Sequence, residues 1–260
     1  MNELSNTSRE MSDHRMVITA CCRVGEVRQN NEDMILVRNR YIRDDRYDTE
    51  INLDKCDKAL LAIADGMGGY QGGEVASEEV LSSLHFYVSD LPKGLSCEAF
   101  NAAMADWLDS INNVINAKGK ENESLQNMGT TLVAIVIYDN RIFWMSCGDS
   151  RLYRLRDGKL LQITTDHSLN TLYGEAKHSN VLTNCIGAGC TSSYLDINEF
   201  TEDVRYGDIY LLCSDGLSDM VNNDTIAHLL SSGCSAEKLC LAAEAAGGFD
   251  NVSACVIRVQ

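Results

Sequence analysis

The sequence predicts one large domain built from both β-strands and α-helices. Its 260 residues, 45% of them hydrophobic, are enough to bury a sizeable core. Short apolar runs bounded by turn residues predict strands, and two stretches with apolar residues at helical spacing predict a pair of packed helices. The apolar run at residues 60–64 is the element around which the others are organised, because it ends directly on a carboxylate, Asp65.

A glycine-rich loop follows Asp65 and leads into an amphipathic stretch that begins near Glu74. Glycines accept backbone angles that other residues avoid, and they let a ligand or metal approach the main chain closely. A dinucleotide-binding loop does not fit, because Gln71 stands where the third glycine is required, and the chain has no Gly-Lys-Ser/Thr of a Walker loop. By itself, the stretch is equally compatible with an ordinary turn that carries a solvated aspartate.

The remaining elements can be placed in chain order. Residues 1–14 are polar and aperiodic and predict a loose tail, which leaves 15–260 as the domain. Residues 38–58 are heavily charged and predict a loop or an exposed hairpin. The apolar patterns predict strands at 16–22, 34–37, 60–64, 130–138, 141–147, 151–155, 159–163, 209–213 and 252–259, and helices at 80–91, 100–115, 226–230 and 236–246.

Charge and cysteine usage narrow the class of protein. A formal net charge of −16 opposes binding to nucleic acid or to an anionic membrane, and it suits a protein that gathers divalent cations. The 11 cysteines include no CxxC pair, and the adjacent Cys21 and Cys22 would point to opposite faces of a strand. We expect a reduced, cytoplasmic chain without a disulfide framework. No apolar run of membrane length is present, so we expect neither secretion nor membrane insertion.

Carboxylates recur where predicted strands begin or end, and together they suggest a site. If they converge at one end of a sheet, their mutual repulsion must be relieved, and divalent ions such as Mg²⁺ or Mn²⁺ prefer oxygen ligands of this kind. Two such ions can share a water, lower its pKa and present it for attack on phosphorus. Arg28 adds a bidentate fork for anionic phosphoryl oxygens. The aspartates concerned are Asp33, Asp65, Asp149, Asp215 and Asp250.

Seven short motifs occur in the order seen in metal-dependent protein phosphatases of the PP2C (PPM) family, and the chain resembles the short bacterial form from about residue 15 onward. The motifs are Arg28 with Glu32-Asp33, Asp65-Gly66-Met67-Gly68-Gly69, Gly129-Thr130-Thr131, Gly148-Asp149-Ser150-Arg151, Asp166-His167-Ser168, Ser214-Asp215-Gly216-Leu217 and Asp250-Asn251. The resemblance implies an α+β fold, a four-layer αββα sandwich of two antiparallel β-sheets flanked by helices. It also implies hydrolysis of phosphoserine and phosphothreonine in proteins by a water activated between two divalent metals.

The resemblance also implies a role for each matching residue. Asp65 should bridge the two Mn²⁺ or Mg²⁺ ions and orient the nucleophilic water, and the Gly66 carbonyl should bind one of them. Asp215 and Asp250 should bind the other ion. Arg28 should hold the phosphate.

Further positions are expected around this core. Glu32 and Asp33 should act near the metals, partly through coordinated waters, and Asp149 should carry a possible third, weaker ion together with Asp215. Three further motif residues are expected to be structural: Asn251, Asp166 and His167.

Two departures from the family pattern bear on the chemistry. Met67 stands where many relatives have a histidine proposed as general acid, so no acid is assigned and metal-bound water is the alternative donor. The interval that forms the flap beside the site, residues 169–180, is shorter than in most bacterial members. The expected partners are phosphoproteins, modified by a serine/threonine kinase, and the expected state is a monomer.

Two other functions are compatible with parts of the sequence. Cys22 and Arg28 satisfy the Cys-x5-Arg pattern of cysteine-based phosphatases, but Glu26 between them would oppose an anion. A domain of this fold could also have lost catalysis and act by binding alone, because fold does not establish function. A substituted metal ligand would be the mark of such a domain, and every expected ligand is present.

Overall fold

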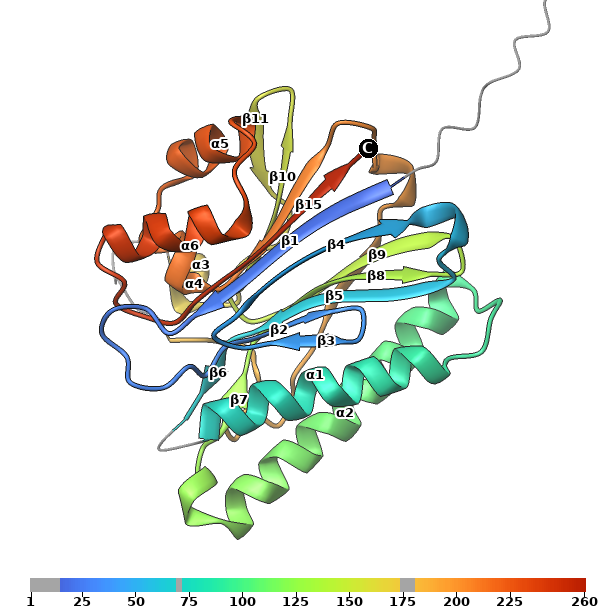
Figure 1. Cartoon of the computed structure of the whole chain (residues 1–260). Helices are drawn as coiled ribbons and strands as arrows, with labels where there is room; N and C mark the ends of the chain where they lie inside the picture. Colours follow the sequence, from blue (N-terminus) through green and yellow to red (C-terminus); the bar gives the residue numbers. More distant parts are fainter. Residues whose placement is uncertain (1–14, 69–71, 174–180) are drawn as a thin grey trace, which may run out of the picture.

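The computed structural model describes residues 15–68, 72–173 and 181–260. The predicted tail, loop residues 69–71 and flap residues 174–180 lie outside this part of the chain. Two six-stranded antiparallel sheets face each other between two layers of helices, so the predicted αββα sandwich is confirmed (Figure 1). A third sheet of three short strands lies at one end of the sandwich.

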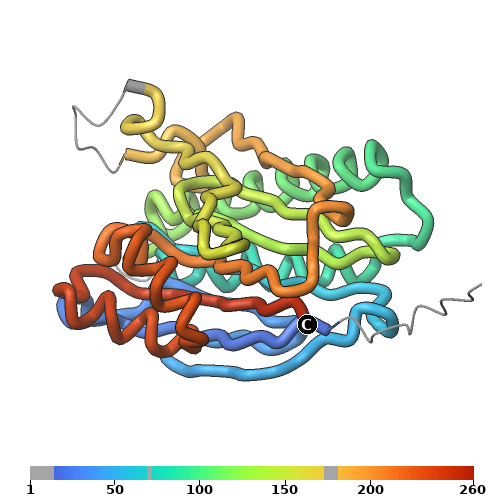
Figure 2. Tube along the Cα trace, turned by 90° about the horizontal axis from the view of Figure 1, so that it is seen from above, coloured from blue at the N-terminus to red at the C-terminus, as the bar shows by residue number. Residues whose placement is uncertain are grey.

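The first sheet consists, in spatial order, of β11 (Lys159–Gln162), β10 (Arg151–Arg156), β14 (Ile209–Cys213), β15 (Val252–Val259), β1 (Arg15–Arg23) and β4 (Arg46–Asn52). The second consists of β13 (Asp196–Glu199), β9 (Arg141–Cys147), β8 (Leu132–Tyr138), β5 (Lys58–Ala64), β2 (Met34–Val37) and β3 (Arg40–Ile42). The small sheet consists of β12 (Ile186–Gly187), β7 (Gly129–Thr130) and β6 (Gly66–Met67). Figures 1 and 2 both show the first and last strands of the described chain, β1 and β15, side by side.

Helices cover the outer face of each sheet. The first sheet is covered by α4 (Asp215–Ser218), α5 (Asn223–Ser231) and α6 (Ala236–Ala245), and the second by α1 (Gly72–Asp90) and α2 (Cys97–Glu121). The shorter elements are α3 (Leu169–Tyr173) and the 3₁₀ turns η1 (Leu53–Lys55), η2 (Glu123–Leu125) and η4 (Thr201–Asp203). In the described ranges no helix is both long and apolar enough to cross a membrane.

The strands alternate between two buried faces, and this explains their continuous apolar sequences. Leu61 and Ile63 of β5 pack between the two sheets, whereas Leu60 packs under the helices α1 and α2. Cys21 and Cys22 likewise fall into different clusters, one under α6 and one between the sheets, as predicted. Since a one-residue slip would exchange the two faces, this pattern fixes the register of each strand.

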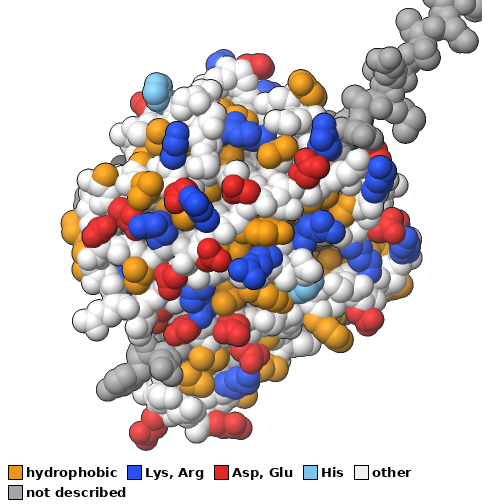
Figure 3. Space-filling model, viewed as in Figure 1, with side chains coloured by type: hydrophobic (Ala, Val, Ile, Leu, Met, Phe, Trp, Pro, Cys, Tyr) orange, Lys and Arg blue, Asp and Glu red, His pale blue; other side chains and the backbone are white. Residues whose placement is uncertain are grey.

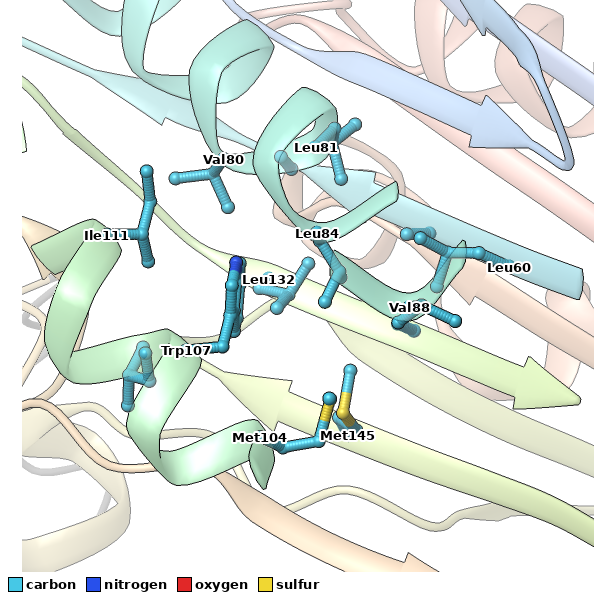
Figure 4. Close-up of a cluster of buried hydrophobic side chains, with 14 of the residues drawn as sticks. Leu60, Val80, Leu81, Leu84, Val88, Met104, Trp107, Ile111, Leu132 and Met145 are labelled. Atoms are coloured by element: carbon cyan, nitrogen blue, oxygen red, sulfur yellow. The ribbon is translucent and has the colours of Figure 1, made fainter. Parts of the chain in front are cut away.

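The predicted helix pair is confirmed. The residues at helical spacing form one apolar face on each helix, and Figure 4 shows Val80, Leu84 and Val88 of α1 beside Met104 and Trp107 of α2 over the strands. Two polar contacts fasten this layer. The hydroxyl of Ser96 caps the N-terminus of α2 by accepting from Ala99 N (3.1 Å), and Trp107 Nε1 donates to Ser83 Oγ (3.0 Å).

The prediction of a loop or exposed hairpin at residues 38–58 is wrong. This segment contains β3, which pairs with β2, and β4, which pairs with β1 in the other sheet. Ile42 and Ile51 anchor the two strands in the core between the sheets, while most of their neighbours are charged and exposed. Edge strands of this kind carry few apolar residues, so the pattern that predicts a strand is weak there.

Acidic and basic side chains are interspersed over the face shown in Figure 3. The surplus of acidic residues therefore does not form one continuous patch on that face. The carboxylates that matter for function lie instead at the end of the sandwich where β5, β9 and β14 end and β2 and β15 begin. This end, on the left in Figure 1, is opposite to the described chain termini.

Candidate metal centre

The five aspartates predicted to converge are brought to the same end of the two sheets. Asp65 joins β5 to β6, Asp215 begins α4 two residues after the last residue of β14, and Asp33 immediately precedes β2. The remaining two lie two residues from a strand, Asp149 after β9 and Asp250 before β15. The side chains thus come from strand ends of the two six-stranded sheets and from the first turn of α4. This explains why their positions are far apart in the sequence.

The backbone of Asp65 is held firmly. Its carbonyl accepts hydrogen bonds from Thr131 N (2.9 Å) and from Thr130 Oγ1 (2.8 Å), and its amide donates to Thr131 Oγ1 (3.1 Å). Its side chain lies among other carboxylates, within hydrogen-bonding distance of Asp215. Burial, and next the nearby charge of Asp33, raise the pKa of Asp65 well above its ordinary value.

Asp33 is completely buried, and only one of its carboxylate oxygens is satisfied. Ser214 Oγ donates to Oδ2 (2.8 Å), whereas no described residue donates to Oδ1. Burial raises the pKa of Asp33 to about 7, and the charges of Asp215 and Asp250 add to this effect. An unpaired carboxylate oxygen at this depth costs stability unless a cation or a proton compensates it.

Asp215 and Asp149 share this environment. Burial raises the pKa of Asp149 to about 7, and the nearest charge that adds to the shift is Asp215. Burial raises the pKa of Asp215 to about 6, with further contributions from Asp219 and Asp250. Four of the predicted aspartates therefore carry raised pKa values for one shared reason, which is burial next to other carboxylates.

Asp219 belongs to the same cluster and was not predicted from the sequence. It lies one helical turn beyond Asp215, and its amide donates to the Asp215 carbonyl (2.8 Å). Burial raises the pKa of Asp219, and the nearby charges of Asp166 and Asp250 act in the same direction. The spacing of four residues from Asp215 could have identified it, since residues four apart lie on the same helix face.

Glycines bring the backbone of this region into close contact. A Cβ on Gly66 would lie 2.2 Å from the Gly73 carbonyl oxygen and 2.6 Å from the Glu32 carbonyl oxygen. A Cβ on Gly73 would lie 2.7 Å from Cδ of Glu32, whose carboxylate accepts from the Gly73 amide. Burial raises the pKa of Glu32, while Arg28 lowers it in part. Gly66 and Gly73 are therefore required for packing, independently of any ligand.

Arg28 and Asp250 form an ion pair at the rim of the cluster. Arg28 Nη2 donates to Asp250 Oδ2 (2.7 Å), and about half of the Arg28 side chain, 52%, is exposed. Asn251 fastens the preceding loop, because its Nδ2 donates to the carbonyls of Val24 and Asn30, both at 2.9 Å, and its Oδ1 accepts from Glu32 N (2.8 Å). Asn251 thus holds the segment that carries Arg28 and Glu32.

Two motif residues expected to be structural lie beside the cluster and support it. Asp166 accepts from both Nε and Nη2 of Arg151, at 3.0 and 2.6 Å. His167 Nδ1 accepts from Gly148 N (3.1 Å), and its Nε2 lies 3.0 Å from Asp196 Oδ2. These contacts fix the strand end that presents Asp149.

The chemistry of the cluster fits divalent cations. Its oxygen-only donors, their raised pKa values and the unpaired Oδ1 of Asp33 all indicate a missing positive charge. The arrangement itself is open, since among the described residues no three carboxylate, imidazole or thiol groups meet closely enough to enclose an ion. Asp65 and Asp215 hydrogen-bond to each other and Asp250 binds Arg28, so ion binding would require these carboxylates to exchange partners.

Comparisons with known proteins identify the family of this chain. A family model described as protein phosphatase 2C matches residues 37–239. Serine/threonine protein phosphatase PstP of Mycobacterium tuberculosis is 37% identical over 245 residues, which cover 90% of this chain and 43% of PstP. The chain therefore spans less than half the length of that relative. Protein phosphatase PhpP of Streptococcus pneumoniae is 29% identical over 260 residues, which cover 94% of this chain and 98% of PhpP.

A solved structure gives the same result. The crystal structure of the catalytic domain of PstP in complex with two manganese ions matches with a TM-score of 0.71 and 34% identity, over 95% of this chain and 99% of that domain. Sequence and fold thus agree, and the chain belongs to the protein phosphatase 2C family.

Proposed function

We propose that this protein is a metal-dependent phosphatase that hydrolyses phosphoserine and phosphothreonine in proteins. The observation that carries the proposal is the cluster of carboxylates at one end of the sandwich, in which Asp33, Asp65, Asp149 and Asp215 have raised pKa values, next to a half-exposed arginine. The manganese-bound structure of PstP and the phosphatase names of the relatives support the same function.

In this proposal Asp65, Asp215, Asp250 and the Gly66 carbonyl hold two Mn²⁺ or Mg²⁺ ions. When bound, the two ions lower the pKa of a shared water for in-line attack and neutralise the phosphoryl oxygens. Asp65 orients that water. Hydrogen bonds with the backbone and hydroxyls of residues 130–131 keep the Asp65 backbone in position.

The remaining residues of the cluster act around this core. Glu32 and Asp33 act next to the ions, partly through water. Asp149 and Asp215 form a weaker third ion site, to which we add Asp219 because of its position in the cluster.

Arg28 binds the substrate phosphate. Its guanidinium is half exposed and held by one carboxylate, so it can exchange Asp250 for phosphoryl oxygens when substrate arrives. Met67 has no proton to donate to the leaving alkoxide, and we assign no general acid among the side chains. We further propose that the protein acts as a cytoplasmic monomer opposite a serine/threonine kinase.

The structure argues against the cysteine-based alternative. Cys22 is fully buried, and burial raises its pKa to about 12, so its thiolate is unavailable as a nucleophile. Its thiol hydrogen-bonds with the side chains of Asn31 and Ser253, whereas Arg28 points to Asp250 instead. Every expected metal ligand is present, so an activity assay decides between a phosphatase and a domain that acts by binding alone.

Phosphate release from phosphoserine and phosphothreonine peptides tests the proposal. We expect turnover with Mn²⁺, complete loss in excess EDTA, and recovery with Mn²⁺ but much less with Ca²⁺, which is a weaker Lewis acid in a looser shell. Undiminished turnover in chelator with no metal left in the protein would contradict the mechanism. Absence of turnover with Mn²⁺ bound would favour the binding-only function.

A further inference from the structure

A pair of thiols flanks β12, outside the metal centre. Cys185 immediately precedes β12 and Cys190 follows it after two residues. The carbonyl oxygen of Gly187 accepts from Cys190 N (2.8 Å) and from the Cys185 thiol (3.9 Å), so the turn folds the two cysteines toward each other. The two thiols lie close enough for each to affect the pKa of the other.

The environments of the two thiols differ in a way that suits a reactive pair. Cys190 is partly exposed. Burial opposes its ionisation, but the polar groups of Ser193, Ser192 and Cys185 near its sulfur bring its pKa below the ordinary value. Cys185 is buried, and burial raises its pKa to about 11. Oxidation-sensitive cysteines are accessible, have a low pKa and lie next to a second cysteine that can resolve the first product.

The turn is fixed to α2 by two asparagines, which keep the thiols close. Nδ2 of Asn112 and Nδ2 of Asn116 each donate to the Cys190 carbonyl, both at 2.9 Å. In return Gly187 N donates to Asn112 Oδ1 (2.7 Å) and Gly189 N to Asn116 Oδ1 (2.9 Å). Because the turn keeps both cysteines at the same carbonyl, that of Gly187, a reaction between their sulfurs is intramolecular.

We propose that Cys190 and Cys185 are an oxidative modification site, at which a hydroperoxide converts the two thiols to a reversible disulfide. The Cys190 thiolate attacks a peroxide oxygen and breaks the O–O bond, which yields a sulfenic acid at Cys190 and, with hydrogen peroxide, hydroxide. The Cys185 sulfur then attacks the Cys190 sulfur, the S–O bond breaks, and the Cys185 proton leaves with the oxygen as water. Overall, two thiols lose two electrons and two protons while one hydrogen peroxide becomes two waters.

Other thiols of the chain provide internal comparisons. Cys21 and Cys240 also lie close enough for each to affect the pKa of the other, but both are buried and out of reach of an oxidant. Cys56 and Cys97 are partly exposed like Cys190, but their pKa values are raised, in each case first by burial. Access and ionisation together therefore single out the pair on the turn.

Peptide mapping tests the site directly. Trypsin releases residues 178–205, which contain Cys185 and Cys190 and no other cysteine. After treatment with hydrogen peroxide at neutral pH and alkylation of the remaining thiols, we expect this peptide to be unalkylated. Its mass should be that of the reduced peptide less two hydrogens. Dithiothreitol should restore alkylation, and the peptides that carry Cys56 and Cys97 should stay alkylated throughout.

Three variants separate the roles of the two thiols, with folding checked by circular dichroism. Cys185→Ser should leave Cys190 as a sulfenic acid that dimedone traps. Cys190→Ser should leave Cys185 unoxidised, and the control Cys97→Ser should keep the disulfide. Equal oxidation of Cys56, Cys97 and Cys190, or continued oxidation of Cys185 in Cys190→Ser, would overturn the proposal. Each readout is thiol chemistry, so it is independent of phosphatase activity.

Discussion

Strand β14 has an aspartate next to each end, Asp208 buried and Asp215 partly buried, and the two have opposite electrostatics. Asp208 precedes the strand, and Arg156 donates to both of its oxygens, each at 2.7 Å. Burial opposes ionisation of Asp208, but Arg156 and neighbouring donors outweigh it and hold its pKa below the ordinary value. Asp215 follows the strand among Asp65, Asp219 and Asp250, and its pKa is raised to about 6.

The comparison shows that the partner of a buried carboxylate, rather than its depth, indicates what the carboxylate does. A carboxylate with a guanidinium across it is compensated within the chain and belongs to the scaffold. A carboxylate that faces other carboxylates leaves the folded protein short of positive charge, which a bound cation can supply. The two ends of β14 therefore divide structure from function.

Substitution of the aspartates at the two ends of β14 should change turnover and stability separately. The change in turnover should be larger than for any other variant below. Asp215→Asn should slow phosphate release by about 100-fold or more, because it removes a proposed metal ligand. It should raise the melting temperature of the metal-free protein, because one of several repelling charges is lost.

The matched control is Asp208→Asn at the other end of the strand. It should leave turnover per folded molecule unchanged, while it costs stability on the order of 2 kcal/mol because Arg156, which is partly exposed, loses its charge-assisted hydrogen bonds. A thermal melt with and without EDTA, together with a turnover assay, compares the two variants. If Asp208→Asn lost activity and Asp215→Asn kept it, the division between the two ends would be wrong.

Removal of the rim arginine should have the next largest effect. Arg28→Ala should lower kcat/KM for phosphopeptides by about 10-fold to 100-fold, because a charge-assisted contact with the phosphate is lost. Arg46→Ala is a suitable control, since Arg46 is also an exposed arginine in a single ion pair, with Glu237 at 2.5 Å. Steady-state kinetics that gave the same parameters for both variants would make Arg28 a scaffold residue.

Asp149 allows the two core metal ions to be distinguished from the third ion. Asp149→Ala should retain two tightly bound ions and a normal fold but turn over about 10-fold more slowly, because it removes only the weaker site. Asp219→Asn, one turn from Asp215, should behave in the same way. Metal analysis that showed loss of a core ion in either variant would contradict this assignment.

The change of the melting temperature with pH is the smallest of these effects. Asp33, Asp149 and Asp215 have folded-state pKa values of about 7, 7 and 6, against an ordinary value of 3.8. Their burial therefore costs stability fully above about pH 7, and the cost declines as protons bind between pH 7 and 4. The opposite contribution of Asp208, whose pKa is lowered, is lost only at lower pH.

The metal-free protein should accordingly melt a few degrees higher at about pH 5.5 than at about pH 8. Saturating Mn²⁺ should reduce or reverse this difference, because ion binding requires deprotonated ligands and weakens as the pH falls. A melting temperature of the metal-free protein that fell over the same interval would show that the cluster does not govern this dependence.

The part of the fold that the sequence predicted best is the fully buried part. The predicted bounds 34–37, 209–213 and 252–259 coincide with β2, β14 and β15, because strands buried on both faces are continuous apolar runs. Strands β3, β4 and β13 were missed, because edge strands keep few apolar residues and take their conformation from pairing with distant segments.

The candidate site could be predicted only in part for a similar reason. Asp65 and Asp215 follow apolar strands, so their place at a sheet edge could be inferred from local sequence. Asp208 lies just as close to β14, and what makes it structural is Arg156, which is 52 residues away. The sequence does not state which charges meet in space, so it could not distinguish the two kinds of aspartate without a family resemblance.

The most direct test of the account is a count of bound metal. Equilibrium dialysis against Mn²⁺, followed by elemental analysis, should find two tightly held ions per chain in the wild-type protein and in Asp208→Asn. Asp215→Asn should hold fewer, because its carboxylate is a proposed ligand of a core ion and Asp208 is not. Wild-type protein without tightly bound Mn²⁺, or equal metal content in the two variants, would contradict the claim that the carboxylate cluster forms a metal centre.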